Sequence, residues 1–277
     1  MDYKIIVDSC CDITPEIAEK LQVELVPLTL QLGEKEFTDN YELDLPDFMA
    51  QMKACTKKAG SAAPSPQAYM DAIIKAGRAF VITASSKISG SYSSAKLGEE
   101  YAAEKGTEDV HVFDSKTASA GEMLIVMKLR ELIAKGLPKG QIVSAITGFI
   151  DGMKTYFVLE NYDNLIKSGR LNKVTEKIIS LLNIRLIMGA DGNGSIALFA
   201  KPRGAKQMLD KLISFVGASG KPTDGENMVI SHCNNLSLAQ QISDIVKQKF
   251  NFKEILIVPT RGISSLYADE KGIIIAF

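Results

Sequence analysis

Short apolar runs alternate with amphipathic stretches along the first half of the chain. The runs KIIVDS (Lys4 to Ser9) and AFVIT (Ala79 to Thr83) are apolar enough for buried strands. Thr14-Pro15 and Ser65-Pro66 each place a capping side chain before a proline, which is typical of a helix start. This alternation predicts a largely parallel sheet with helices on both faces.

The rest of the first half continues the same pattern. VELVPLTLQL (23–32) is expected to be extended, with a turn at 33–35 that could make a hairpin. Asp44 is a candidate helix cap, and VHVFDS is a further strand. Other helices are expected after Pro66, through Ala95 and Ala102, over 118–135 and after Pro138.

The pattern changes after about residue 153, where a second lobe is expected. RLIMGADGNGSIALFA contains two apolar runs around an Asp-Gly-Asn-Gly turn, a strong hairpin signal. Helices over 203–217 and 236–249 alternate with the strands MVIS, EILIVP and GIIIAF. The sequence therefore predicts an α/β protein of two lobes, an N-terminal parallel α/β/α lobe (1–153) and a C-terminal mixed-sheet lobe (154–277).

Composition narrows the class of partner. The 277 residues carry 32 Lys and Arg against 33 Asp and Glu, a net charge of −1. This balance gives no broad attraction to nucleic acid or to an anionic membrane. The start has no signal-peptide pattern, and no apolar run reaches the ~18 residues of a membrane span, so a cytoplasmic protein without stable membrane insertion is expected.

Familiar catalytic and cofactor motifs are missing from the sequence. The cysteines, Cys10, Cys11, Cys55 and Cys233, form no C-x-x-C pair and are expected to be free thiols. His111 and His232 are the two histidines, and a structural role is favoured for each. There is no metal-binding motif, P-loop, G-x-G-x-x-G cradle or G-x-S-x-G, so no metal or cofactor is expected.

Two serine-rich segments remain as candidate sites. Residues 60–66 read GSAAPSP and residues 85–92 read SSKISGSY, and each leads into an expected helix. Hydroxyls and free amides at a helix start can hold an anion. Ordinary capping explains serine there equally well, so the residues alone leave both interpretations open.

Several segments, taken in order, resemble the DegV family of bacterial fatty-acid-binding proteins. The opening IIVDSCCDIT places Asp8, Ser9 and Asp12 at matching positions, and SAAPSP and SSKISGSYSSA match two serine-containing family segments. HVFDSKTASAGEM, NLIKSGRL and KPRGAK follow in the family's order. The resemblance covers almost the whole chain.

The resemblance implies a fatty acid held between the two lobes with its carboxylate at their interface. It also implies a partner, a separate dihydroxyacetone-kinase-like subunit that phosphorylates the acid with ATP. By position, the carboxylate would be bound by Ser61, Ser89, Gly90 and Ser91. Arg170 and Arg203 match basic positions expected near the mouth or the kinase contact.

The sequence departs from the family pattern at two places. Ala62 and Ala63 replace more polar residues, and PTRGISSLYA stands where many members carry a histidine. Arg261, Ser264 and Ser265 are the candidates to take over from that histidine.

The expected function is that of a fatty-acid carrier subunit that is not catalytic alone. Two alternatives stay open at this point. One is a serine-dependent lipid or thioester hydrolase that uses Ser61 or Ser89. The other is a carrier of another small apolar acid.

Overall fold

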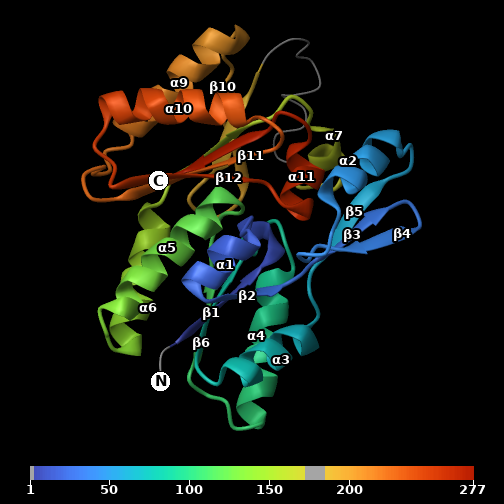
Figure 1. Cartoon of the computed structure of the whole chain (residues 1–277), viewed down its shortest axis with the longest axis vertical. Helices are drawn as coiled ribbons and strands as arrows, with labels where there is room; N and C mark the ends of the chain where they lie inside the picture. The colour runs from blue at the N-terminus through green and yellow to red at the C-terminus, as the bar shows by residue number, and fades with distance from the viewer. Residues whose placement is uncertain (1–2, 172–184) are drawn as a thin grey trace.

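The computed structural model describes residues 3–171 and 185–277. Its core is built on two main sheets, and a smaller third sheet lies beside them (Figure 1). None of the helices in these two ranges is long and apolar enough to cross a bilayer.

The first sheet is parallel throughout and comes from the N-terminal part of the chain. Its order is β2 (Val23–Val26), β1 (Lys4–Asp8), β6 (Ala79–Thr83) and β7 (Val110–Asp114). Every residue of β6 is buried, as the unbroken apolar run predicted. Helices α3 (Pro66–Ala76) and α4 (Ser91–Glu104) cover the outer face through a cluster that includes Ile6, Tyr69 and Val81.

The run 23–32, which was expected to be extended, contributes one strand to each of two sheets. Pro27 and Leu28 separate β2 from β3 (Thr29–Leu32), and β3 joins β4 (Lys35–Thr38) and β5 (Ala59–Ala62) in the three-stranded sheet. The hairpin expected at 33–35 is confirmed, because β3 and β4 are antiparallel and Leu32 faces Lys35. A proline has no amide hydrogen to donate, which is consistent with the end of the first pairing here.

The second main sheet is mixed and comes from the C-terminal part. Its order is β10 (Ile196–Ala200), β9 (Ile187–Ala190), β8 (Thr155–Val158), β13 (Ile273–Ala276), β11 (Asn227–His232) and β12 (Glu254–Pro259). Only β11 and β12 among these neighbours are parallel, and β9 and β10 form the expected hairpin. Helices α9 (Gly204–Ala218) and α10 (Leu236–Lys249) contribute to the apolar cluster on its outer face.

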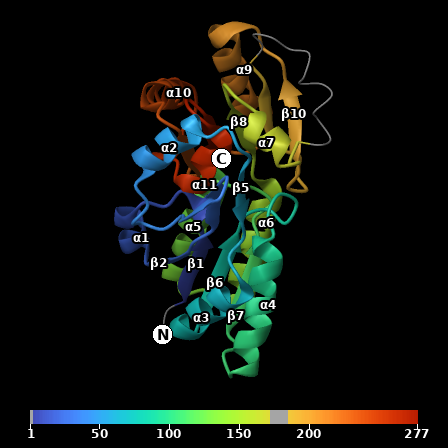
Figure 2. The same cartoon turned by 90° about the vertical axis from the view of Figure 1, so that its right-hand side faces the viewer.

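Helix α5 (Ala120–Ala134) lies in the middle of the molecule. It packs against β6 of the parallel sheet and against β11 and β13 of the mixed sheet, with α6 (Lys139–Gly152) beside it. The largest apolar cluster consequently contains residues of both sheets, such as Phe80, Leu124 and Val229. In both views α3 and α4 lie at one end of the molecule and α9 and α10 at the other (Figures 1 and 2).

The remaining elements are short and lie near the junction of the sheets. They are the 3-10 helix η1 (Ser9–Cys11) and the helices α1 (Pro15–Leu21), α2 (Leu45–Ala54), α7 (Asp163–Lys167) and α11 (Gly262–Ala268). Helix α11 packs against α2, α7 and η1 (Figure 1). Neither α7, α11 nor strand β5 was predicted from the sequence.

The predicted α/β class, with a parallel N-terminal sheet and a mixed C-terminal sheet, is confirmed by this topology. The chain passes from α6 to β8 at residues 153–154, where the boundary was expected. The division into 1–153 and 154–277 as separate domains stays a prediction.

Candidate binding cavity

A cavity of about 130 Å³ lies where the parallel and mixed sheets meet. This volume is on the order of ten times what one buried water needs. Residues that follow parallel strands border it, together with residues of the mixed sheet and α11. Most of its wall is apolar, including Leu28, Ile88, Phe157, Leu165, Ile196 and Ile274.

A row of polar groups crosses one part of this wall. The hydroxyls of Ser61 and Tyr267 lie 2.9 Å apart, and Arg170 donates from Nη1 to the Tyr267 hydroxyl at 2.8 Å. The Arg170 guanidinium also lies 4.5 Å from the centre of the Tyr267 ring. All three residues border the cavity, so the guanidinium and two hydroxyls form one hydrogen-bonded row beside an apolar space.

Ser61 sits in a different local structure from the one expected. It lies in β5, where its backbone faces Leu30 of β3, and helix α3 begins only at Pro66. Its hydroxyl is therefore presented by a strand, and the N-terminus of α3 is capped by Ser65. The pairing with β3 overrides the turn-like composition of residues 60–66.

Ser89 borders the cavity from the turn before α4. Its hydroxyl lies 3.0 Å from the Ser91 hydroxyl and accepts the Ser91 N–H at 3.2 Å. Arg170 holds the same turn by donating from Nε to the Ile88 carbonyl at 2.7 Å. Gly90 is the N-cap of α4, and it lies outside the cavity wall together with the buried Ser91.

Another hydroxyl of the wall is bonded to a carboxylate behind it. Ser119 donates to Oδ2 of Asp12. The Arg261 N–H donates to Oδ1 at 2.7 Å. Asp12 has no exposed surface, and burial raises its pKa to about 7.

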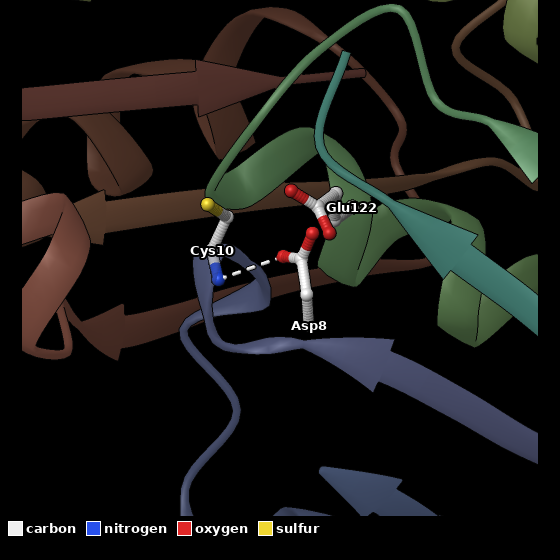
Figure 3. Close-up of side chains that lie close together, drawn as sticks. All are labelled: Asp8, Cys10 and Glu122. Carbon is white, nitrogen blue, oxygen red and sulfur yellow. Dashed lines mark hydrogen bonds between the residues drawn. The ribbon is translucent and has the colours of Figure 1, made fainter. Parts of the chain in front are cut away.

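A second group of buried acids lies next to Asp12. One carboxyl oxygen of Asp8, one of Glu122 and the Cys10 sulfur all lie within 4.8 Å of one another (Figure 3). Asp8 accepts the N–H groups of Cys10 and Ala84, each at 3.0 Å, whereas the Glu122 carboxyl oxygens have no hydrogen-bond partner among the described residues. Burial, followed by the charge of Asp8, raises the pKa of Glu122 well above its ordinary value. This shift favours the neutral form of the Glu122 carboxyl.

The other candidates from the sequence lie away from the wall. Arg261 donates from its guanidinium to the Asn40 carbonyl at 2.6 Å, and its centre lies 5.6 Å from the Tyr41 ring centre. Ser265 is buried, with its hydroxyl 2.8 Å from that of Thr260. Arg203 is exposed at the start of α9. Of the residues proposed for the missing histidine, Ser264 is the one that borders the cavity.

Tyr267 is the functional candidate that sequence reasoning missed. It lies three residues after Ser264 in α11, and residues at that spacing share one face of a helix. A helix predicted over GISSLYA would have placed the Ser264 and Tyr267 side chains on one face. The segment is only seven residues long, however, and its N-cap residue makes no side-chain capping bond. Its N-terminal amides are instead bound by Asp39 from a distant loop, at 2.9 Å from Gly262 and 2.8 Å from Ile263.

Together, the fold and the cavity define a two-sheet α/β protein with an internal, mainly apolar space and one polar wall. The model of the DegV family, described as an uncharacterised protein family, matches residues 2–277. The chain belongs to the DegV family.

Relatives share the sequence over the whole chain, and two of known structure also share the fold. A DegV domain-containing protein of Streptococcus gordonii is 38% identical, over 100% of this chain and 99% of its own. A DegV protein of Ruminococcus gnavus, solved with vaccenic acid, is 37% identical with a TM-score of 0.95, over 99% of each chain. The Fatty Acid Kinase (Fak) B3 protein of Streptococcus pneumoniae, solved with linoleic acid, is 34% identical with a TM-score of 0.91, over 100% of this chain and 99% of its own.

Proposed function

We propose that this protein binds a long-chain fatty acid in its cavity and presents the carboxylate to a separate ATP-dependent kinase. The observation that supports this proposal most directly is the cavity itself, an apolar space with hydroxyls and a guanidinium gathered on one wall. The fatty acids in the R. gnavus and S. pneumoniae relatives support this ligand class. The name of the S. pneumoniae relative supports the kinase partnership.

The apolar wall suits the tail of such a ligand. Transfer of each methylene from water contributes about 0.8 kcal/mol, so roughly 14 methylenes contribute about 11 kcal/mol before the costs of association.

The polar row suits the head group. A carboxylate has only acceptor atoms, and an unpaired buried carboxylate costs several kcal/mol. Ser61 and Tyr267 share hydroxyl protons, and Arg170 supplies a permanent positive charge at the Tyr267 oxygen. Ser89 reaches the same cavity from the turn that Arg170 holds. These groups would offset the desolvation of the head group and keep it at one wall.

The proposed role needs the carboxylate to be reached by a second protein. Arg170 is half-buried, so it can contact both the cavity and the surface. Arg203 is exposed, so its positive charge can contact a kinase subunit or the negative charge of ATP at the outer surface. We infer a carrier subunit that leaves the transfer of phosphate to its partner.

A hydrolase that uses Ser61 or Ser89 finds less support. His111 lies in β7 and His232 at the end of β11, and neither borders the cavity described in residues 3–171 and 185–277. A serine nucleophile needs a base within hydrogen-bond reach. The described contacts of both serines are with hydroxyl and backbone groups rather than with imidazole.

Native mass spectrometry of protein purified from bacteria tests the ligand. We expect a bound mass in the range of a long-chain fatty acid, removed by delipidation and restored by added oleic acid. A clean ligand-free mass that stays unchanged after addition of oleic acid would contradict the proposal.

The double change Ser61→Ala with Ser89→Ala tests the head-group contacts. Loss of two hydrogen bonds to a carboxylate should weaken binding by roughly 1–3 kcal/mol. Ser93→Ala is the matched control, because Ser93 is exposed on α4. An affinity equal to that of the control would remove both serines from the site.

The kinase role has its own test. The loaded protein should give acyl phosphate only when ATP and a dihydroxyacetone-kinase-like subunit are both present. Formation of acyl phosphate by this chain alone, or no formation with any such subunit, would count against the carrier role while leaving fatty-acid binding intact.

A further inference from the structure

Asp12 holds one hydroxyl of the cavity wall without being part of the wall. Ser119, the residue directly before α5, borders the cavity. Its hydroxyl donates to the Asp12 carboxylate, which is fully buried behind it. The second donor to Asp12, the Arg261 N–H, comes from the backbone and is fixed in direction.

A serine hydroxyl has only one proton to donate. An ionised carboxylate has no proton, so the Ser119 proton must point toward Asp12. The cavity then sees only the lone pairs of the Ser119 oxygen. A ligand carboxylate beside Ser119 also offers only lone pairs, and the two sets repel.

One added proton removes the conflict. If Asp12 is protonated, it can donate to Ser119, and Ser119 can turn its own proton toward the ligand. If the proton sits on the ligand instead, the ligand can donate to a lone pair of Ser119. In both arrangements the complex contains one proton more than the separate ionised partners.

We propose that Asp12 is a positioning residue that couples binding of the fatty-acid head group to the uptake of one proton, through the hydroxyl of Ser119. The proposal rests on the proposed function, because it concerns the same head group. Beyond the proposed function, it states that binding requires one added proton at this part of the wall, and that Asp12 is the residue responsible for this requirement.

The buried acids around Asp12 favour the added proton. The charge of Asp39, directly after β4, raises the pKa of Asp12, and Glu122 of α5 and Asp8 of β1 are further buried acids of this region. The thiols of Cys10 and Cys11 in η1 have a pKa raised well above the ordinary value, first by burial, so they add no charge at neutral pH. Of the cations, Arg261 binds the Asn40 carbonyl through its guanidinium, and Arg170 borders the same cavity, where it donates to Tyr267 and to the Ile88 carbonyl.

The sign of the pH dependence follows from the state of the free partners. A free fatty acid, like other carboxyls, ionises well below pH 7, and burial raises the pKa of Asp12 to about 7. Between these values Asp12 already holds the proton and affinity should be flat. Above about pH 7 the proton must be taken from solvent, so Kd should rise toward tenfold per pH unit.

Calorimetry on the wild-type protein tests this without any variant. Dodecanoic acid, below its micelle concentration, is titrated into delipidated protein at pH 8.5 in two buffers with different enthalpies of ionisation. We expect uptake of about one proton per acid bound. Tight binding with no proton uptake would overturn the role of Asp12 and leave fatty-acid binding standing. Absence of binding at every pH would instead overturn the proposed function.

Asp12→Asn identifies the group responsible. The amide can accept from the Arg261 N–H and donate to Ser119, as protonated Asp12 would, but it does not titrate. We expect a flat pH profile and a Kd at pH 8.5 at least tenfold lower than that of the wild type. Glu122→Gln is the matched control, since Glu122 is an equally buried acid whose carboxyl oxygens have no hydrogen-bond partner in the described part of the chain. A wild-type pH slope in Asp12→Asn, or its loss in Glu122→Gln alone, would assign the proton to another group.

Discussion

Tyr267 connects a permanent charge to a neutral hydroxyl at the cavity wall. Arg170 donates to its oxygen, which strengthens the Tyr267 hydroxyl as a donor to Ser61 or to a ligand. The same guanidinium contacts the tyrosine ring and the Ile88 carbonyl, so its position is set from three sides. The polar row of the cavity wall is thereby organised through one aromatic side chain from α11.

Tyr267→Phe removes the shared oxygen and keeps the ring. We expect fatty-acid affinity to fall by about 1 kcal/mol, roughly fivefold in Kd, because Ser61 and Arg170 lose their common partner. Isothermal titration with delipidated protein measures the change. Tyr101→Phe, at an exposed position of α4, is the control, and an equal effect of both variants would exclude a specific role of Tyr267.

Glu122 gives a second prediction at the same scale. Burial raises its pKa, so the folded protein keeps a proton that the unfolded chain releases above about pH 4.5. This contribution to stability is complete at lower pH and decreases as pH rises. Glu122→Gln should therefore gain stability relative to the wild type by more than about 1 kcal/mol at pH 8, and by much less at pH 4.5.

Urea unfolding at the two pH values measures this difference. Glu104→Gln, at an exposed site on α4, is the control. An advantage of Glu122→Gln that does not grow between pH 4.5 and pH 8 would show that Glu122 is already ionised in the folded protein.

At the scale of elements, the contact between α3 and α4 depends on a glycine. A Cβ on Gly98 would lie 2.7 Å from Cβ of Tyr69 and 2.8 Å from the Pro66 carbonyl oxygen. In α6, a Cβ on Gly148 would meet no atom within 4 Å in the described part of the chain. The same residue type therefore has a packing role in one helix and none in the other.

Alanine at these two positions should have opposite effects on the free energy of unfolding. Gly98→Ala is expected to destabilise the protein by about 1–3 kcal/mol, because the helices must separate. Gly148→Ala should stabilise it by up to about 1 kcal/mol through helix propensity. Chemical denaturation measures both, and a stabilising Gly98→Ala would contradict the observed close approach.

The elements also show which features the sequence could predict. Long periodic helices such as α5 and α9, and apolar strands such as β6, were predicted to within about two residues of their observed limits. The elements missed, β5, α7 and α11, are at most seven residues long and are held by distant partners such as β3 and Asp39. Local composition contains no signal for such partners. Ser61 and Ser89 were found through family resemblance, whereas the contacts of Tyr267 and Asp12 depend on tertiary structure.

At the scale of the whole molecule, the cavity is shared by parts of the chain far apart in sequence. Its wall includes Cys10 and Ser61 on one side of the 153–154 boundary and Phe157 and Tyr267 on the other. A ligand in this space would contact both sheets at once. Binding should therefore stabilise the fold as a unit.

Saturation with a fatty acid should raise the melting temperature. At a free ligand concentration 100 times Kd, binding to the folded state contributes about 2.7 kcal/mol, or roughly 5 °C for a chain of this size. Scanning fluorimetry of delipidated protein with increasing dodecanoic acid measures the shift. An unchanged melting temperature at saturating ligand would show that the unfolded chain binds the acid equally well.

The place of α5 between the two sheets has a consequence for the evolution and engineering of this chain. A fragment ending near residue 153 would keep α5 but leave uncovered the side that now packs on β11 and β13. A fragment starting there would show the inner face of β11 and β13 to water, with residues such as Val229 and Ile274 unprotected. Neither piece should be stable alone, so recombination between relatives at this point should succeed only when both pieces bring matching surfaces.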